Sequence, residues 1–138
     1  MSWILIADAR GIKAALVLGA DGVQIGTAFL ATSQSNATHG HKEKLFTSDA
    51  KYTTLTKAFT GRLSRGVINR LTEELKSHEN LFAPYPLQSK FMALLKAYPA
   101  NESSNPGFQS YWAGQSASLL KCRDAEILME TLVNEMNK

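Results

Sequence analysis

The sequence predicts an α/β fold, because two short strand patterns near its start each lead into a helix and the rest of the chain is mostly helical. The first strand pattern is an apolar run at residues 4–6. The second alternates apolar Val23 and Ile25 with Gln24, after a tight turn at Asp21-Gly22. A strand, a helix, a second strand and a second helix therefore occupy the first thirty residues or so.

The two helices that follow these strands have recognisable starts. Asp8 caps the first helix, which ends at Gly19 and whose apolar face carries Ile12, Ala15 and Leu16. Thr27 opens the second helix, so its hydroxyl and the free amides of the first turn face whatever lies beyond the strand end. Such free helix amides attract anions.

The end of the second strand predicts a phosphate-binding site. Gly26 lets the backbone approach a ligand where a Cβ would block it. Together with Thr27, this arrangement suits the phosphate of a flavin or of a sugar. The candidate cofactor-binding residues are Gln24, Ile25, Gly26 and Thr27, and the structural alternative is an ordinary parallel strand end.

Residues 33–138 are expected to form a mostly helical extension that begins with a polar loop at 33–40. Tyr52–Phe59 alternates apolar and polar residues and favours a strand. Helices are expected over about 41–49, 67–77 and 88–98 and after Asp124. The apolar faces of the last three carry Val67, Ile68, Leu71 and Leu75, then Phe91, Leu94, Leu95 and Tyr98, then Ile127, Leu128, Leu132 and Met136.

Several segments of the chain resemble the nitronate monooxygenases, formerly called 2-nitropropane dioxygenases. They are Ile6–Ile12, Leu18–Leu30, His41-Lys42, Leu55–Arg62, Arg65-Gly66, Asn69-Arg70, Pro84–Gln88 and Trp112–Gln115. The resemblance implies the C-terminal portion of a (β/α)8 TIM barrel, with its last two strands in residues 1–32 and a mostly helical extension in residues 33–138. Because a whole barrel needs about 250 residues, we expect a fragment whose upstream half carries the other strands.

The resemblance also implies an activity, the FMN-dependent oxidation of alkyl nitronates by oxygen. Gln24, Ile25, Gly26 and Thr27 would hold the FMN phosphate. The histidine that the family places beside the flavin would lie upstream, so we expect no catalytic residue in this chain and an inactive isolated fragment. None of the three histidines present takes that role, namely His39, His41 and His78.

Two alternatives to this activity stay open. One is an FMN-dependent enoyl-reductase, whose phosphate motif is very similar, although Pro84–Gln88 and Trp112–Gln115 favour the monooxygenase. The other is a non-catalytic remnant that needs an upstream barrel half.

Other candidate features each have a structural interpretation beside a functional one. The segment His39-Gly40-His41 could hold a metal, but no third ligand is evident and a solvated loop is favoured. Arg62 and Arg65 could steer an anion, and surface ion pairs are favoured. Trp112–Gln115 could line a flavin pocket, with a packed tryptophan as the equal alternative. Cys122 is expected to pack rather than to act as a nucleophile.

Composition and charge restrict the classes of partner. The net charge of +3 comes from scattered basic residues, which argues against nucleic-acid binding. No apolar run reaches the roughly 18 residues of a membrane span, and the start lacks the basic region of a signal peptide. The single cysteine fits a reducing compartment, so the cytoplasm is the expected location.

The two strands are expected to be left without their barrel neighbours. Their backbone edges and the apolar faces of Ile4, Ile6, Val23 and Ile25 would then be uncovered. We therefore expect the fragment either to associate with a second copy or to cover these strands with its final helix.

Overall fold

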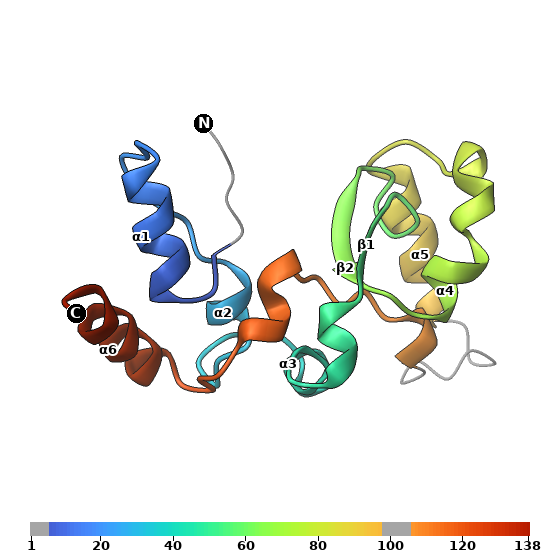
Figure 1. The fold of residues 1–138 in the computed structure, drawn as a ribbon. Helices are drawn as coiled ribbons and strands as arrows, with labels where there is room; N and C mark the ends of the chain where they lie inside the picture. The colour runs from blue at the N-terminus through green and yellow to red at the C-terminus, as the bar shows by residue number, and fades with distance from the viewer. Residues whose placement is uncertain (1–5, 98–105) are drawn as a thin grey trace. The chain divides into compact units, whose positions relative to one another are not determined.

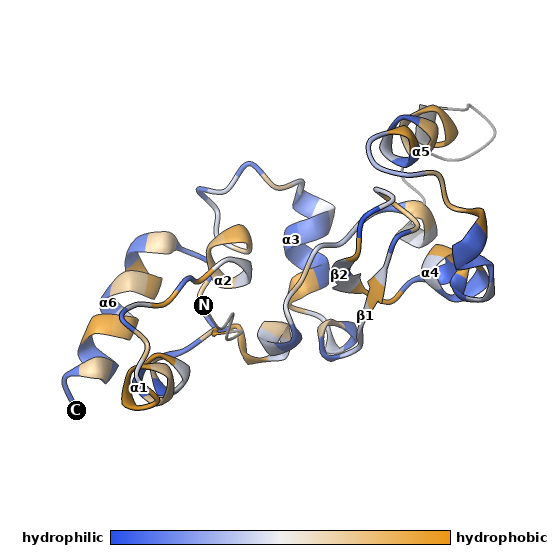
Figure 2. Ribbon diagram, turned by 90° about the horizontal axis from the view of Figure 1, so that it is seen from above, coloured by the Kyte–Doolittle hydropathy of each residue, from blue (hydrophilic) through white to orange (hydrophobic). Residues whose placement is uncertain are grey.

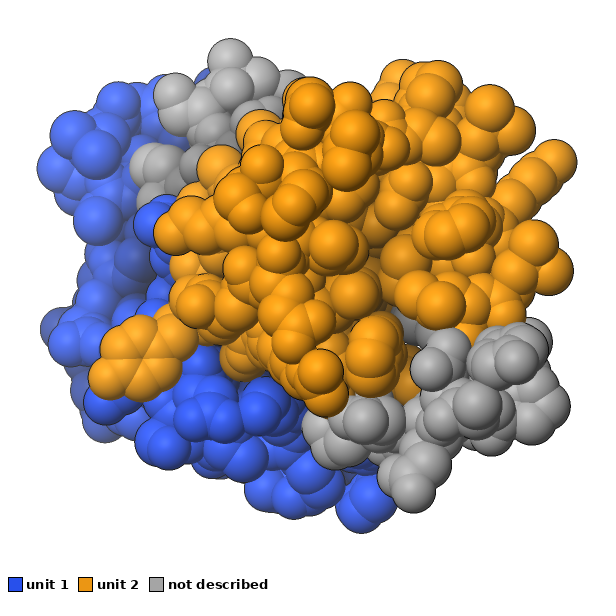
Figure 3. Space-filling model, turned by 90° about the vertical axis from the view of Figure 1, so that its right-hand side faces the viewer, with its two compact units in different colours: residues 1–51, 113–138 blue, residues 52–112 orange. Residues whose placement is uncertain are grey.

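The computed structural model describes residues 6–97 and 106–138. The chain divides into two compact units, the first made of residues 1–51 and 113–138 and the second of residues 52–112 (Figure 3). Each unit has its own core. Within the described ranges, no helix combines the length and the apolar character that a membrane span requires.

The first unit consists of helices and connecting segments (Figure 1). Its elements are α1 (Ala9–Val17), α2 (Thr27–Leu30), α3 (His39–Leu45), the 3₁₀ helices η1 (Ser48–Lys51) and η4 (Gln115–Leu119), and α6 (Ala125–Met136). Side-chain caps begin three of them, with Asp8 at α1, Thr38 at α3 and Asp124 at α6. The predicted starts at Asp8 and Asp124 are confirmed.

The cap at Asp8 shows why α1 begins there. Its Oδ1 accepts a hydrogen bond from the Gly11 N–H at 3.2 Å, and Arg10 Nη2 lies 2.6 Å from its Oδ2. The Arg10 guanidinium holds the pKa of Asp8 below its ordinary value, so the carboxylate stays ionised and able to accept. At the other end, Gly19 has a φ of +90°, which stops the helix as predicted.

The core of the first unit lies between α6, α1 and α2. Its buried residues are Ala9, Ala28, Leu128 and Leu132, and the half-buried side chains packed around them include Ile12, Ile25, Phe29, Cys122 and Met136. The predicted apolar seam of the last helix is confirmed at Leu128, Leu132 and Met136. It is wrong at Ile127, which is 56% exposed.

The two predicted barrel strands are not formed as strands in the described part of the chain. Residues 6–7 and 22–26 have no regular secondary structure, and residues 1–5 lie outside the described ranges. A strand needs a neighbouring segment to accept and donate its backbone hydrogen bonds. The described sheet contains only β1 and β2, which belong to the second unit. The alternation of the second pattern persists, because Val23 and Ile25 are half-buried while Gln24 is exposed.

The final helix covers part of the second of these segments, which is one of the two arrangements expected. Ile25 packs against the cluster that contains Leu128 and Leu132 of α6. The fold class is therefore mixed helix and sheet, as predicted, with a helical cover over the segment that was expected to be a barrel strand.

The second unit combines a hairpin with helices. Its elements are β1 (Thr53–Thr56), β2 (Ser64–Val67), α4 (Arg70–Glu74), the 3₁₀ helices η2 (Lys76–Leu81) and η3 (Pro106–Phe108), and α5 (Leu87–Ala97). β1 and β2 are antiparallel, with Thr53 opposite Val67 and Thr56 opposite Ser64. The core is formed by Phe59, Leu71 and Met92, with Trp112 edge-on to Phe59 at a ring distance of 5.5 Å.

The helix expected over 67–77 is shorter than predicted. It begins at Arg70, because Asn69 and Thr72 form a reciprocal capping box. Val67 belongs instead to β2, a strand that the sequence did not predict, where its N–H donates to the carbonyl of Tyr111 at 2.8 Å. The strand expected within Tyr52–Phe59 is confirmed as β1.

Helix α5 lies where it was expected, but only part of its predicted apolar face is buried. Met92 is buried and Leu95 is half-buried, whereas Phe91 and Leu94 are 59% and 72% exposed. Tyr98, the last residue of the predicted apolar stripe, lies outside the described residues. In Figure 2, helix α5 carries orange, hydrophobic residues, whereas α3 is mostly blue and hydrophilic.

Two features of Gly61, in the second unit, require a glycine: its backbone conformation and the close approach of a neighbouring backbone segment. Gly61 has a φ of +81°, and a Cβ built on it would overlap the Ala83 carbonyl oxygen and lie 2.7 Å from Tyr85 N. We expect Gly61→Ala to lower the free energy of unfolding by about 3 kcal/mol, measured by urea denaturation. The matched control is Gly19→Ala, which has a φ of +90° but open space around its Cβ, and should cost only about 1 kcal/mol. Equal losses in the two variants would contradict a role for the close approach at Gly61.

Candidate functional site

The segment that carries the candidate phosphate site runs along the first unit and into α2. Ala28 is buried and Phe29 packs against the core, so the first turn of α2 is fixed in place. The Leu30 N–H donates to the Gly26 carbonyl at 2.9 Å and closes that turn. Among residues 6–97 and 106–138, the N–H groups of Thr27 and Ala28 have no hydrogen-bond acceptor, as is usual in the first turn of a helix.

The surroundings of Gly26 are open. Its φ of −102° and ψ of −64° are open to any residue, so the backbone conformation does not require glycine. A Cβ built on Gly26 would have no atom within 4 Å, so close packing does not require glycine either. The space beside the Gly26 backbone is therefore open in the described structure.

Thr27 connects this segment to a distant part of the sequence. Its Oγ1 accepts a hydrogen bond from the Gly114 N–H at 2.9 Å. Gly114 lies within Trp112–Gln115, so two of the segments that suggested a functional site share a hydrogen bond. Buried Ala113 and Ala117 flank Gly114 and fix its position.

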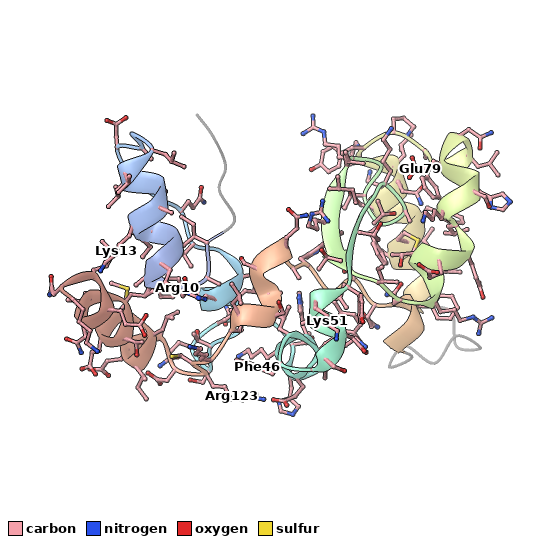
Figure 4. The ribbon with its side chains drawn as sticks, in the orientation of Figure 1. Arg10, Lys13, Phe46, Lys51, Glu79 and Arg123 are labelled. Atoms are coloured by element: carbon pink, nitrogen blue, oxygen red, sulfur yellow. The ribbon has the colours of Figure 1, made fainter. Side chains whose placement is uncertain are left out.

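The segment that follows Gly114 is anchored to α3 by Arg123. The Arg123 guanidinium pairs with Glu43 and lies 4.0 Å from the centre of the Phe46 ring (Figure 4). The hydrogen bond from Arg123 holds the pKa of the Glu43 carboxyl below its ordinary value. The Arg123 carbonyl also accepts a hydrogen bond from the Ser33 N–H at 2.7 Å. These contacts hold residues 113–123 against the rest of the first unit.

An apolar groove lies on the other side of the candidate segment. It has a volume of about 350 Å³ and is lined by side chains that include Val23, Ile25, Phe29, Met129, Val133 and Met136. Gln24 and Gly26 are exposed and do not line it. The segment therefore has an apolar side toward α6 and an open, polar side at Gln24 and Gly26.

The comparison with sequence families decides where this chain belongs. The sequence model of the family described as nitronate monooxygenase matches residues 6–135. This chain belongs to the nitronate monooxygenase family. A relative from Staphylococcus aureus strain JH9, named a probable nitronate monooxygenase, is 37% identical over 133 residues, which is 96% of this chain and 37% of the relative.

Solved structures agree with this assignment. The chain is similar to the nitroalkane oxidase from Streptomyces ansochromogenes, with 34% identity, a TM-score of 0.83, and coverage of 96% of this chain and 37% of that one. It is also similar to FabK from Thermotoga maritima, with 28% identity, a TM-score of 0.70, and coverage of 96% and 42%. The chain therefore spans little more than a third of the length of the relatives that it matches.

Within this member of the nitronate monooxygenase family, the other candidate features have structural contacts. Arg65 Nη1 donates to Thr53 Oγ1 at 3.2 Å, and the Arg62 guanidinium lies 5.0 Å from the centre of the Tyr85 ring. These are not the acidic partners that we expected. Trp112 packs edge-on against Phe59, as the structural alternative predicted.

The histidines and the cysteine do not form a further site in the described structure. His39 is exposed and His41 is buried, and the described residues contain no group of three metal-ligating side chains. Cys122 packs at the edge of the core cluster, 4.0 Å from Thr131 Oγ1. This placement supports packing as its role.

Proposed function

We propose that this chain supplies the FMN-phosphate site of an oxidoreductase that oxidises alkyl nitronates with oxygen. The observation that carries the proposal is the open backbone at Gly26, where neither conformation nor packing accounts for a glycine. Gly22 and Gly40 are equally open, so the proposal also relies on the position of Gly26 directly before the free N–H groups of α2, in a chain of the nitronate monooxygenase family.

The roles of the candidate residues follow from their surroundings. Gly26 gives the phosphate close access to the backbone, and the N–H groups of Thr27 and Ala28 donate to its oxygens. The exposed Gln24 amide reaches the polar part of the same ligand, whereas Ile25 directs its side chain into the core and contributes its backbone. When bound, FMN would supply the redox chemistry between the nitronate and oxygen.

We propose that residues 1–32 are the C-terminal part of a (β/α)8 barrel and that residues 33–138 are its helical extension. An upstream polypeptide would provide the remaining strands and the catalytic groups, since a whole barrel takes about 250 residues. The cytoplasm is the proposed location, in keeping with the half-buried, free thiol of Cys122.

A second activity, that of an FMN-dependent enoyl-reductase, is supported by the similarity to FabK. The lower identity and TM-score of that comparison favour the nitronate activity. The two activities would share the same phosphate site, so residues 24–27 alone do not distinguish them.

The activity is tested in a fusion protein. We expect a fusion of the upstream portion of the Staphylococcus aureus relative to residues 6–138 to bind FMN and to consume oxygen with an alkyl nitronate. Oxygen uptake with the nitronate is compared with NADH oxidation in the presence of an enoyl thioester. A folded, flavin-loaded fusion that acts only on the thioester would contradict the nitronate proposal and favour the reductase.

We also propose that the isolated chain associates with a second copy through the apolar groove beside α6. The groove is about 350 Å³, and Val133 on its wall is 51% exposed. Sedimentation velocity should show concentration-dependent association in the micromolar range, which Val133→Glu abolishes. Val17→Glu is the matched control, because Val17 is exposed but does not line the groove. A sharp monomer at all concentrations, or equal loss of association in both variants, would contradict this.

A further inference from the structure

The hydrogen bond between Gly114 and Thr27 restricts what the Thr27 hydroxyl can do. A hydroxyl carries one donor proton and two acceptor lone pairs. The Gly114 N–H, at 2.9 Å from Thr27 Oγ1, occupies one lone pair, so the hydroxyl proton must point elsewhere. Within residues 6–97 and 106–138, that proton has no acceptor.

The donor that imposes this orientation is itself held by the fold. Gly114 precedes η4 with a φ of −75° and a ψ of 168°, and its carbonyl accepts from the Ala117 N–H at 3.1 Å. Ala113 and Ala117 are 5% and 1% exposed. The Gly114 N–H is thus a fixed donor aimed at Thr27 rather than a mobile group that a ligand recruits.

We propose that the Gly114 N–H is a positioning group of the phosphate site, which makes the Thr27 hydroxyl a donor to the ligand. The inference rests on the proposed function, because it assumes that residues 24–27 face the phosphate. A phosphate monoester dianion offers only acceptors, so it matches a hydroxyl whose proton is turned outward. Gly114 then tunes the site without touching the ligand.

The test compares two substitutions at Gly114 in the full chain. Gly114→Pro removes the N–H at a position whose φ of −75° is close to that of proline, whereas Gly114→Ala keeps the N–H. Affinities for FMN and for riboflavin are measured by flavin fluorescence quenching. We expect FMN to bind about three- to tenfold more weakly to the proline variant than to the alanine variant. Riboflavin, which lacks the phosphate, should bind equally to both.

Variants of Thr27 close the thermodynamic cycle. Thr27→Val should weaken FMN to a similar extent, and adding Gly114→Pro to it should cause no further loss, because the two residues act through one hydrogen bond. Thr27→Ser keeps the hydroxyl and should retain the affinity for FMN. If the proline variant does not fold, an NMR titration with FMN provides a second test. The amide resonance of Gly114 should shift in the wild-type and Thr27→Ser chains, and it should not shift in Thr27→Val.

The outcomes separate this inference from the proposed function. Equal losses for FMN and riboflavin would show a merely structural bond and overturn the positioning role. Equal FMN affinities of the proline and alanine variants would overturn the positioning role as well. In that case, a loss of FMN binding in Gly26→Val would still support the phosphate site. A chain that binds no FMN at millimolar concentration would overturn both.

Discussion

Valine at position 26 is expected to abolish flavin binding in a fusion that joins this chain to the upstream portion of a relative. Its γ-methyl groups would fill the open space in front of Gly26 and exclude the phosphate. The loss of two charge-assisted hydrogen bonds, each worth about 1.5–3 kcal/mol, corresponds to at least roughly a hundredfold weaker binding of FMN. The purified variant should be colourless, as measured by flavin absorbance.

Gly40→Val provides the matched control for this substitution. Gly40 lies in α3, and a Cβ built on it also has no atom within 4 Å. The control should therefore fold and keep its flavin. A Gly26→Val protein that purifies with its full yellow cofactor would place the phosphate somewhere else.

The isolated chain is expected to oxidise no alkyl nitronate beyond the rate of free FMN. On the proposed function, residues 24–27 would supply one side of a phosphate site, and a single short segment cannot enclose a flavin against water. We expect FMN to dissociate from the chain during gel filtration. Oxygen consumption is measured with the chain plus FMN and with FMN alone, and Gly26→Val serves as a further control. A rate above that of free FMN which falls in Gly26→Val would contradict this account.

The parts of the fold that could be predicted from the sequence are those set by local interactions. Asp8 and Asp124 accept hydrogen bonds from N–H groups two or three residues further on. Because the cap and its partners are close in sequence, the helix start can be predicted from a few consecutive residues. The range of α5 was predicted from another local signal, the helical spacing of its apolar residues. Its buried face was not, because the choice between Phe91 and Met92 depends on where Phe59 and Leu71 pack.

The features that sequence reasoning missed depend on distant partners. β2 is four residues long and contains a glycine, so it has no period of its own, and its pairing with β1 defines it. Val23–Ile25 has a strand pattern, but a pattern without a neighbouring strand does not make a sheet.

In the candidate site too, local features could be predicted from the sequence and contacts between distant residues could not. Gly26 and Thr27 were singled out from their local order in the sequence. The donor to Thr27 is 87 residues away, at Gly114. The only signal that could have linked them was that both positions lie in segments resembling the same family, and this does not predict a contact.

The central claim is that residues 24–27 hold the phosphate of FMN. Its most direct test is an NMR titration of the ¹⁵N-labelled chain with FMN, and with riboflavin as the ligand that lacks the phosphate. The account predicts that the amide resonances of Gly26, Thr27 and Ala28 shift most with FMN and do not respond in this way to riboflavin. Phosphate-dependent shifts confined to other residues, or identical shifts with both flavins, would contradict it.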